Sequence, residues 1–192
     1  EGLEGNLGRK DAIEFDLILN TLLSLALSRM ETIAQKVGDR NSEYKSREAE
    51  LNNAINRYFF DSEQIIYKTY ENRGHISELG NALAILCGAA KNCEVQIAEK
   101  LTQNRMISCS LSLRCFVYDA LLQANRKKYT GYILKDIESR YKKMLDERAT
   151  TFWETEEGAN AFGGAGSLCH GWSAMPVYYY HILRQGGKEN VL

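Results

Sequence analysis

One pattern recurs along the chain: an amphipathic helical segment is followed by a short polar connection, and the 192 residues include a single proline. Apolar residues that recur at steps of three and four mark the buried side of a helix. Segments with this spacing are 11–37, 42–60, 77–90, 93–104, 108–124, 129–147 and 167–184. Short connections favour antiparallel helical hairpins, so we predict an all-α fold.

The first segment has the longest apolar stripe, which predicts a central, buried helix. This stripe steps by four and three through Leu19, Leu23, Ala26, Met30, Ile33 and Val37. The longest contiguous apolar run, residues 17–27, is interrupted by Asn20, Thr21 and Ser24 and is shorter than the roughly 20 apolar residues of a membrane span, so we expect no membrane span. Residues 65–70, IIYKTY, are β-branched or aromatic and predict extended structure.

Composition excludes several classes of function. A hydrophobic content of 44% and a net charge of −1 are typical of a soluble globular domain. Because there is no excess of positive charge to bind phosphates, we expect no nucleic-acid partner. The five cysteines form no CxxC pair and no zinc-binding spacing, so we predict buried thiols, no metal site and no cofactor.

The rare residue types gather in ATTFWETEEGANAFGGAGSLCHGWSAMPVYYY, residues 149–180. This segment holds both tryptophans and the proline, Pro176, which either kinks the last helix or marks where its regular part begins. Four glycines between residues 158 and 166 exclude a continuous helix. A long ordered loop on a helical scaffold is often a binding loop, so we expect the functional site here.

Residue types in this loop are typical of a sugar site. Trp153 offers an apolar face for a sugar ring and Glu154 offers an oxygen for hydroxyl groups or water. The alternative is that Trp153 belongs to the core and Glu154 is merely solvated. His170 and Trp172 follow at the predicted start of the last helix, where a histidine is either a site residue or a structural one.

The motifs TTFWE and SLCHGWSA, separated by a glycine-rich loop, resemble the end of the catalytic domain of the α-L-rhamnosidase family. The resemblance implies an (α/α) toroid of six hairpins and inverting hydrolysis of terminal α-L-rhamnosides of oligo- or polysaccharides. It further implies that Glu154 is the general base and that Trp153, His170 and Trp172 bind the sugar. It covers about residues 1–186 and leaves 187–192 as a tail.

The chain departs from this family in one respect. The family's general acid lies in an earlier segment with a D-C-P-x-R-E-R-like pattern, which does not occur here. We therefore predict the C-terminal half of the catalytic domain, inactive by itself, from a parent that is periplasmic or secreted if it degrades polysaccharides. The alternative is a catalytically incomplete helical module that binds carbohydrate or a partner chain. Half of a toroid would expose apolar hairpin faces, which predicts self-association.

Overall fold

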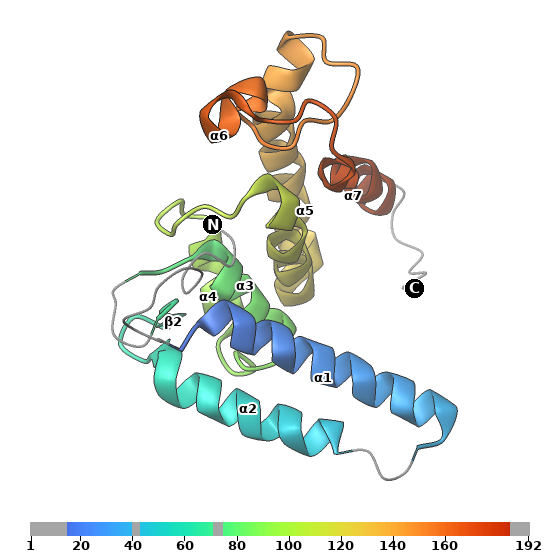
Figure 1. Cartoon of the computed structure of the whole chain (residues 1–192). Helices are drawn as coiled ribbons and strands as arrows, with labels where there is room; N and C mark the ends of the chain where they lie inside the picture. Colours follow the sequence, from blue (N-terminus) through green and yellow to red (C-terminus); the bar gives the residue numbers. More distant parts are fainter. Residues whose placement is uncertain (1–14, 40–42, 71–74, 185–192) are drawn as a thin grey trace. The chain divides into compact units, whose positions relative to one another are not determined.

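The computed structural model describes residues 15–39, 43–70 and 75–184, and these are mostly helical (Figure 1). The chain forms two compact units. The first comprises Glu1–Cys109 with Phe116–Ala124, and the second comprises Ser110–Cys115 with Asn125–Leu192. The predicted all-α fold is confirmed.

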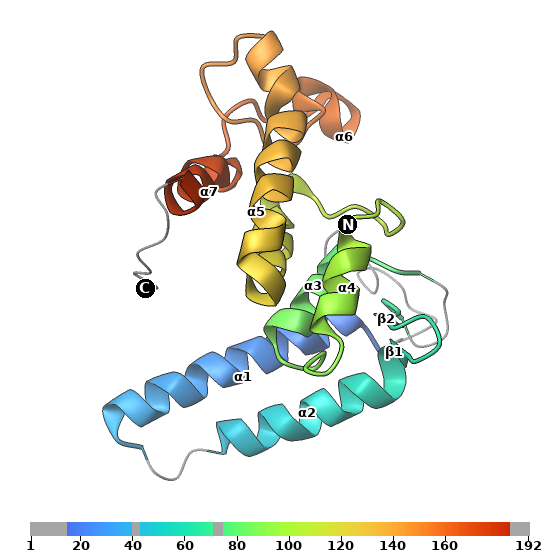
Figure 2. The same ribbon diagram turned by 180° about the vertical axis from the view of Figure 1, so that it is seen from behind.

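In the first unit, α1 (Leu17–Val37) and α2 (Tyr44–Phe59) lie side by side as a hairpin, as both views show (Figures 1 and 2). The carboxylate of Asp16 caps α1 by accepting a hydrogen bond from the N–H of Leu19 at 3.1 Å. The predicted helix starts at residues 11 and 42 lie outside the described residues.

The hairpin leads into a short antiparallel ribbon, β1 (Phe60–Asp61) and β2 (Ile66–Tyr67), which confirms extended structure within residues 65–70. Two further helices follow, α3 (Glu78–Leu86) and α4 (Glu94–Leu101). Every residue from Glu78 to Ile85 is buried. The central helix of this unit is therefore α3, and the prediction that the first helix is central is wrong.

The predicted apolar stripe of α1 is exposed, and Leu23 keeps 54% of its surface. The buried side of α1 is the more polar one, where Thr21 donates a hydrogen bond to the carbonyl of Leu17 at 2.8 Å. Ser24 donates to Oδ1 of Asn52 on α2 at 2.7 Å. These bonds satisfy the hydroxyl groups, so a polar face can be buried at little cost.

By length and composition, α1 would also suffice to cross a membrane. The core helix of a soluble protein and a signal sequence near the N-terminus pass the same test, so length and composition do not distinguish these cases. The absence of a membrane span stays a prediction.

The second unit contains η1 (Leu111–Leu113) and most of α5 (Arg114–Asp146), since only Phe116–Ala124 of this helix belong to the first unit. Asn125 has non-helical angles, φ −165° and ψ 93°, and divides α5 into two helical parts. Its Oδ1 accepts a hydrogen bond from the N–H of Lys128 at 2.9 Å and so caps the second part. The predicted interruption between residues 124 and 129 is confirmed.

The second part of α5 buries the stripe that its periodicity predicts, which includes Ile133, Ile137, Tyr141 and Met144. It is followed by η2 (Gly158–Asn160), α6 (Ala161–Gly164), η3 (Gly171–Ala174) and α7 (Met175–Arg184). Pro176 lies in the first turn of α7, where its missing N–H costs no helical hydrogen bond. The last regular helix therefore begins at Met175, later than the predicted residue 167.

Candidate active site

The two sequence motifs lie side by side in the second unit. The N–H of Glu154 donates to the carbonyl of Ser167 at 2.8 Å, and the N–H of His170 donates to the carbonyl of Phe152 at 2.7 Å. The hydroxyl of Thr151 also donates to the carbonyl of Leu168. Backbone hydrogen bonds thus join segment 151–154 to segment 167–170. Three of the four predicted site residues, Trp153, Glu154 and His170, lie on these two neighbouring segments.

Glu154 is half-buried, and the backbone fixes its carboxylate. Oε2 accepts a hydrogen bond from the N–H of Ser167 at 3.1 Å. The carbonyl of Glu154 accepts one from Nε1 of Trp172 at 3.3 Å. Within the described residues no donor contacts Oε1 of Glu154, so one carboxylate oxygen is held by a hydrogen bond and the other is not.

His170 and Trp172 form the aromatic part of the site. Their rings stack with centroids 3.7 Å apart and an interplanar angle of 15°. The indole of Trp172 remains 48% exposed. Nδ1 of His170 is buried and has no hydrogen-bond partner in the part of the chain that the structure describes. The exposed indole provides an apolar surface of the kind that packs against a sugar ring.

Trp153 has a different environment, since only 5% of its surface is exposed. Lys143 lies over the indole, with Nζ 5.6 Å from the ring centroid, and Gly158 lies against it. A Cβ at Gly158 would approach Cε3 of Trp153 to 2.7 Å, and one at Gly166 would overlap the carbonyl oxygen of Gly158. The glycines therefore allow the loop to close over Trp153. Its sugar contact stays a prediction that this burial does not favour.

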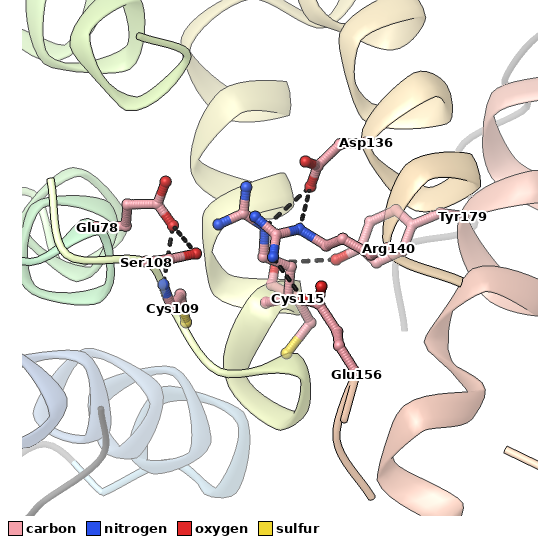
Figure 3. Close-up of polar contacts among 9 residues, drawn as sticks. Glu78, Ser108, Cys109, Cys115, Asp136, Arg140, Glu156 and Tyr179 are labelled. Atoms are coloured by element: carbon pink, nitrogen blue, oxygen red, sulfur yellow. Dashed lines mark hydrogen bonds and ion pairs between the residues drawn. The ribbon is translucent and has the colours of Figure 1, made fainter. Parts of the chain in front are cut away.

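A chain of ion pairs anchors the loop to α5 (Figure 3). Oε1 of Glu156 lies 2.6 Å from Nη1 of Arg140, and Nε of Arg140 lies 2.9 Å from Oδ2 of Asp136. The same Asp136 oxygen lies 3.0 Å from Nε of the fully buried Arg114. Burial alone lowers the pKa of the Arg140 guanidinium, but the charges and hydrogen bonds of Asp136 and Glu156 raise it above its ordinary value.

The sequence indicates a solvated helix face for DIESRYKKMLDER, residues 136–148, and for Asp136 and Arg140 this is wrong. Each keeps only 15% of its side-chain surface. The i, i+4 spacing of an acid and an arginine was the available signal, but such pairs are common on exposed helices. The pair also binds two residues distant in the sequence, since Arg140 contacts Glu156, 16 residues further along, and Asp136 contacts the buried Arg114, 22 residues earlier.

An apolar cleft of about 350 Å³ lies beside the extended segment. Its walls come from α5, residues 149–152 and the start of α7. Phe152 meets Tyr141 edge to face, with ring centroids 6.0 Å apart. The hydroxyl of Tyr141 donates to the carbonyl of Ser173 at 2.7 Å, and burial raises the pKa of this phenol, which keeps it a donor.

Comparison with known proteins identifies the family. A model of the bacterial alpha-L-rhamnosidase six-hairpin glycosidase domain matches residues 6–182. The chain belongs to this family. The likeness predicted from TTFWE and SLCHGWSA is thereby confirmed, and the helical hairpins are those of a six-hairpin glycosidase domain. No curated protein matches the chain.

Two solved structures of rhamnosidases are similar to this six-hairpin domain. The GH78 rhamnosidase of Bacillus sp. GL1 is 27% identical with a TM-score of 0.77, over 87% of this chain and 19% of that protein. The Klebsiella oxytoca rhamnosidase with rhamnose bound is 22% identical with a TM-score of 0.69, over 89% of this chain and 34% of that protein. The chain thus spans about a fifth and a third of these two rhamnosidases.

Proposed function

We propose that the chain is the C-terminal part of the catalytic domain of an inverting glycoside hydrolase that acts on terminal α-L-rhamnosides of oligo- or polysaccharides. The observation that carries this proposal is the geometry of Glu154. One carboxylate oxygen is held by the N–H of Ser167, and the other has no donor among the described residues. This arrangement suits a general base that must accept a proton from water in a fixed position.

The proposed reaction needs a base and an acid. Oε1 of Glu154 takes a proton from water, the water oxygen bonds to the anomeric carbon, and the glycosidic C–O bond breaks. The leaving oxygen then takes a proton from a second carboxyl group, which in inverting enzymes lies about 6.5–9.5 Å from the base. Glu156 is close in sequence, but its carboxylate already binds Arg140, so we assign the acid to another residue.

Two further observations support a sugar substrate. The family is one of rhamnosidase domains, and the similar Klebsiella oxytoca protein was solved with rhamnose bound. Trp172 presents an exposed indole beside the backbone of Glu154. The imidazole of His170 stacks on this indole. We propose that Trp172 packs against the sugar and that His170 donates or accepts a hydrogen bond from it.

Hydrolysis of an aryl α-L-rhamnoside tests this function. We expect no turnover by the 192-residue chain and turnover by a longer protein that carries the remainder of the catalytic domain. In the active protein, Glu154→Gln should lower kcat about 10²–10⁴-fold, because the base is removed while the shape is kept. Glu157→Gln is the matched control, since it removes an exposed carboxylate of the same loop and should leave kcat unchanged. A Glu154→Gln variant that works at the normal rate would refute the assignment.

The second candidate function is carbohydrate binding without catalysis, which the exposed stack of His170 and Trp172 favours. Trp153 and Trp172 are the only tryptophans of the chain, so tryptophan fluorescence reports this segment alone. Saturable quenching by L-rhamnose, lost in Trp172→Ala and without hydrolysis at any chain length, would support binding alone. No change in fluorescence at millimolar rhamnose would contradict it.

A further inference from the structure

The segment that follows Glu154 is attached to one side of α5 at two points. Nη1 of Arg140 binds Oε1 of Glu156 at 2.6 Å, and Nζ of Lys143 donates to the carbonyl of Glu157 at 3.1 Å. Arg140 and Lys143 are three residues apart and therefore lie on the same face of the helix. On this face the helix holds the loop by one side-chain contact and one backbone contact.

The contact through Arg140 is the more rigid of the two. Its guanidinium cannot turn freely, because Nε is bound to Asp136 at 2.9 Å while Nη1 is bound to Glu156. Asp136 is itself bound to Arg114, which has no exposed side-chain surface. The guanidinium of Arg140 is planar and its Nε is held by Asp136, so its Nη1 defines where the carboxylate of Glu156 lies.

The position of Glu156 in turn restricts Glu154, which is only two residues earlier. The carboxylate of Glu154 accepts a hydrogen bond from the N–H of Ser167, so its position depends on the path of the chain just before Glu156. We propose that Arg140, acting through Glu156, is a positioning residue that fixes where the carboxylate of Glu154 lies. This inference rests on the proposed function only for its kinetic consequence, since the position of the carboxylate can be measured without turnover.

Because Glu156 is partly exposed, its substitution can test the positioning of Glu154 without unfolding the second unit. Its side chain is 43% exposed, and ion pairs with one exposed partner contribute little to the stability of a fold. Loss of the Glu156 carboxylate should therefore leave the second unit folded while it frees the loop. Asp136 is a poor choice for this purpose, because it also binds the fully buried Arg114.

Amide hydrogen exchange at Ser167 is the direct test, because the N–H of Ser167 is bonded to the Glu154 carboxylate. In the 192-residue chain, Glu156→Ala should raise the exchange rate of this amide about tenfold or more, as expected for a locally opened loop. Glu156→Gln keeps an oxygen that can accept from Arg140 and should restore most of the protection. Glu157→Ala, which removes the neighbouring carboxylate, should have no effect.

Kinetics supply the second readout. In an active protein that carries this segment, Glu156→Ala should lower kcat about 10–100-fold with little change in KM, because misplacing a catalytic group slows the chemical step. Glu156→Gln should recover most of this loss. If no length of the protein hydrolyses rhamnosides, the proposed function fails while the exchange rates still decide the inference. Unchanged exchange at Ser167 in Glu156→Ala would overturn it, whatever the activity.

Discussion

Asp136→Asn tests whether the ion-pair chain holds the second unit together. One oxygen, Oδ2 of Asp136, lies 3.0 Å from Nε of Arg114 and 2.9 Å from Nε of Arg140. Asparagine has nearly the same shape as aspartate but no charge, so packing is preserved while two guanidiniums lose the negative charge between them. Arg114 then stays buried with no exposed side-chain surface.

The burial of Arg114 sets the expected loss in free energy of unfolding. Removing one partner of a buried ion pair costs about 3–5 kcal/mol. A change of 1 kcal/mol shifts the melting temperature by about 4–8 °C in a unit of 60–100 residues, so Asp136→Asn should lower it by at least about 12 °C.

Thermal unfolding followed by tryptophan fluorescence is the assay, since Trp153 and Trp172 both lie in the second unit. The matched control is Asp146→Asn on the same helix. Asp146 pairs with Lys142 at 2.7 Å, but both side chains are more than half exposed, so its loss should cost less than about 1 kcal/mol. If the two variants melt at the same temperature, the ion-pair chain does not stabilise this unit and the reasoning is wrong.

Two further predictions concern the loop glycine and the exposed helix face. In urea unfolding, Gly158→Ala should destabilise the second unit by about 1–3 kcal/mol more than Gly163→Ala. Both glycines have positive φ, but only a Cβ at Gly158 would meet Trp153. Equal losses of stability would contradict the packing of Gly158 against Trp153. The 192-residue chain should self-associate through the apolar stripe of α1, whose steps of four and three suit pairing with a second copy. Leu23→Glu should shift it towards monomer in sedimentation, and a wild-type chain that is monomeric at high concentration would refute this.

Much of the fold could be predicted from local patterns. Helical periodicity and capping residues are local properties, so the stripe from Ile133 to Met144 and the extended residues near Tyr67 were predicted correctly. The interruption of α5 was also predicted, from the short polar connection between residues 124 and 129, and the structure shows that Asn125 caps the following helix within three residues of itself. The motifs around Glu154 and His170 were sufficient to identify the family.

The buried face of α1 was not predicted, because it depends on residues distant in the sequence. The sequence shows that α1 has an apolar stripe, but α2 and α3 decide which face is buried, and they cover the side of Thr21 and Ser24. Both faces of such a helix can be buried if the hydroxyl groups find acceptors, so periodicity alone cannot choose between them.

The site divides in the same way. The sequence by itself determined which residues are candidates for the site, because a carboxylate, an imidazole and two indoles occur in two short motifs. Only the tertiary structure decided their environments, since it buries Trp153 under Gly158, exposes Trp172 and binds Glu156 to Arg140. Exposure and ion pairing depend on residues that the fold brings together, and no local pattern contains that information.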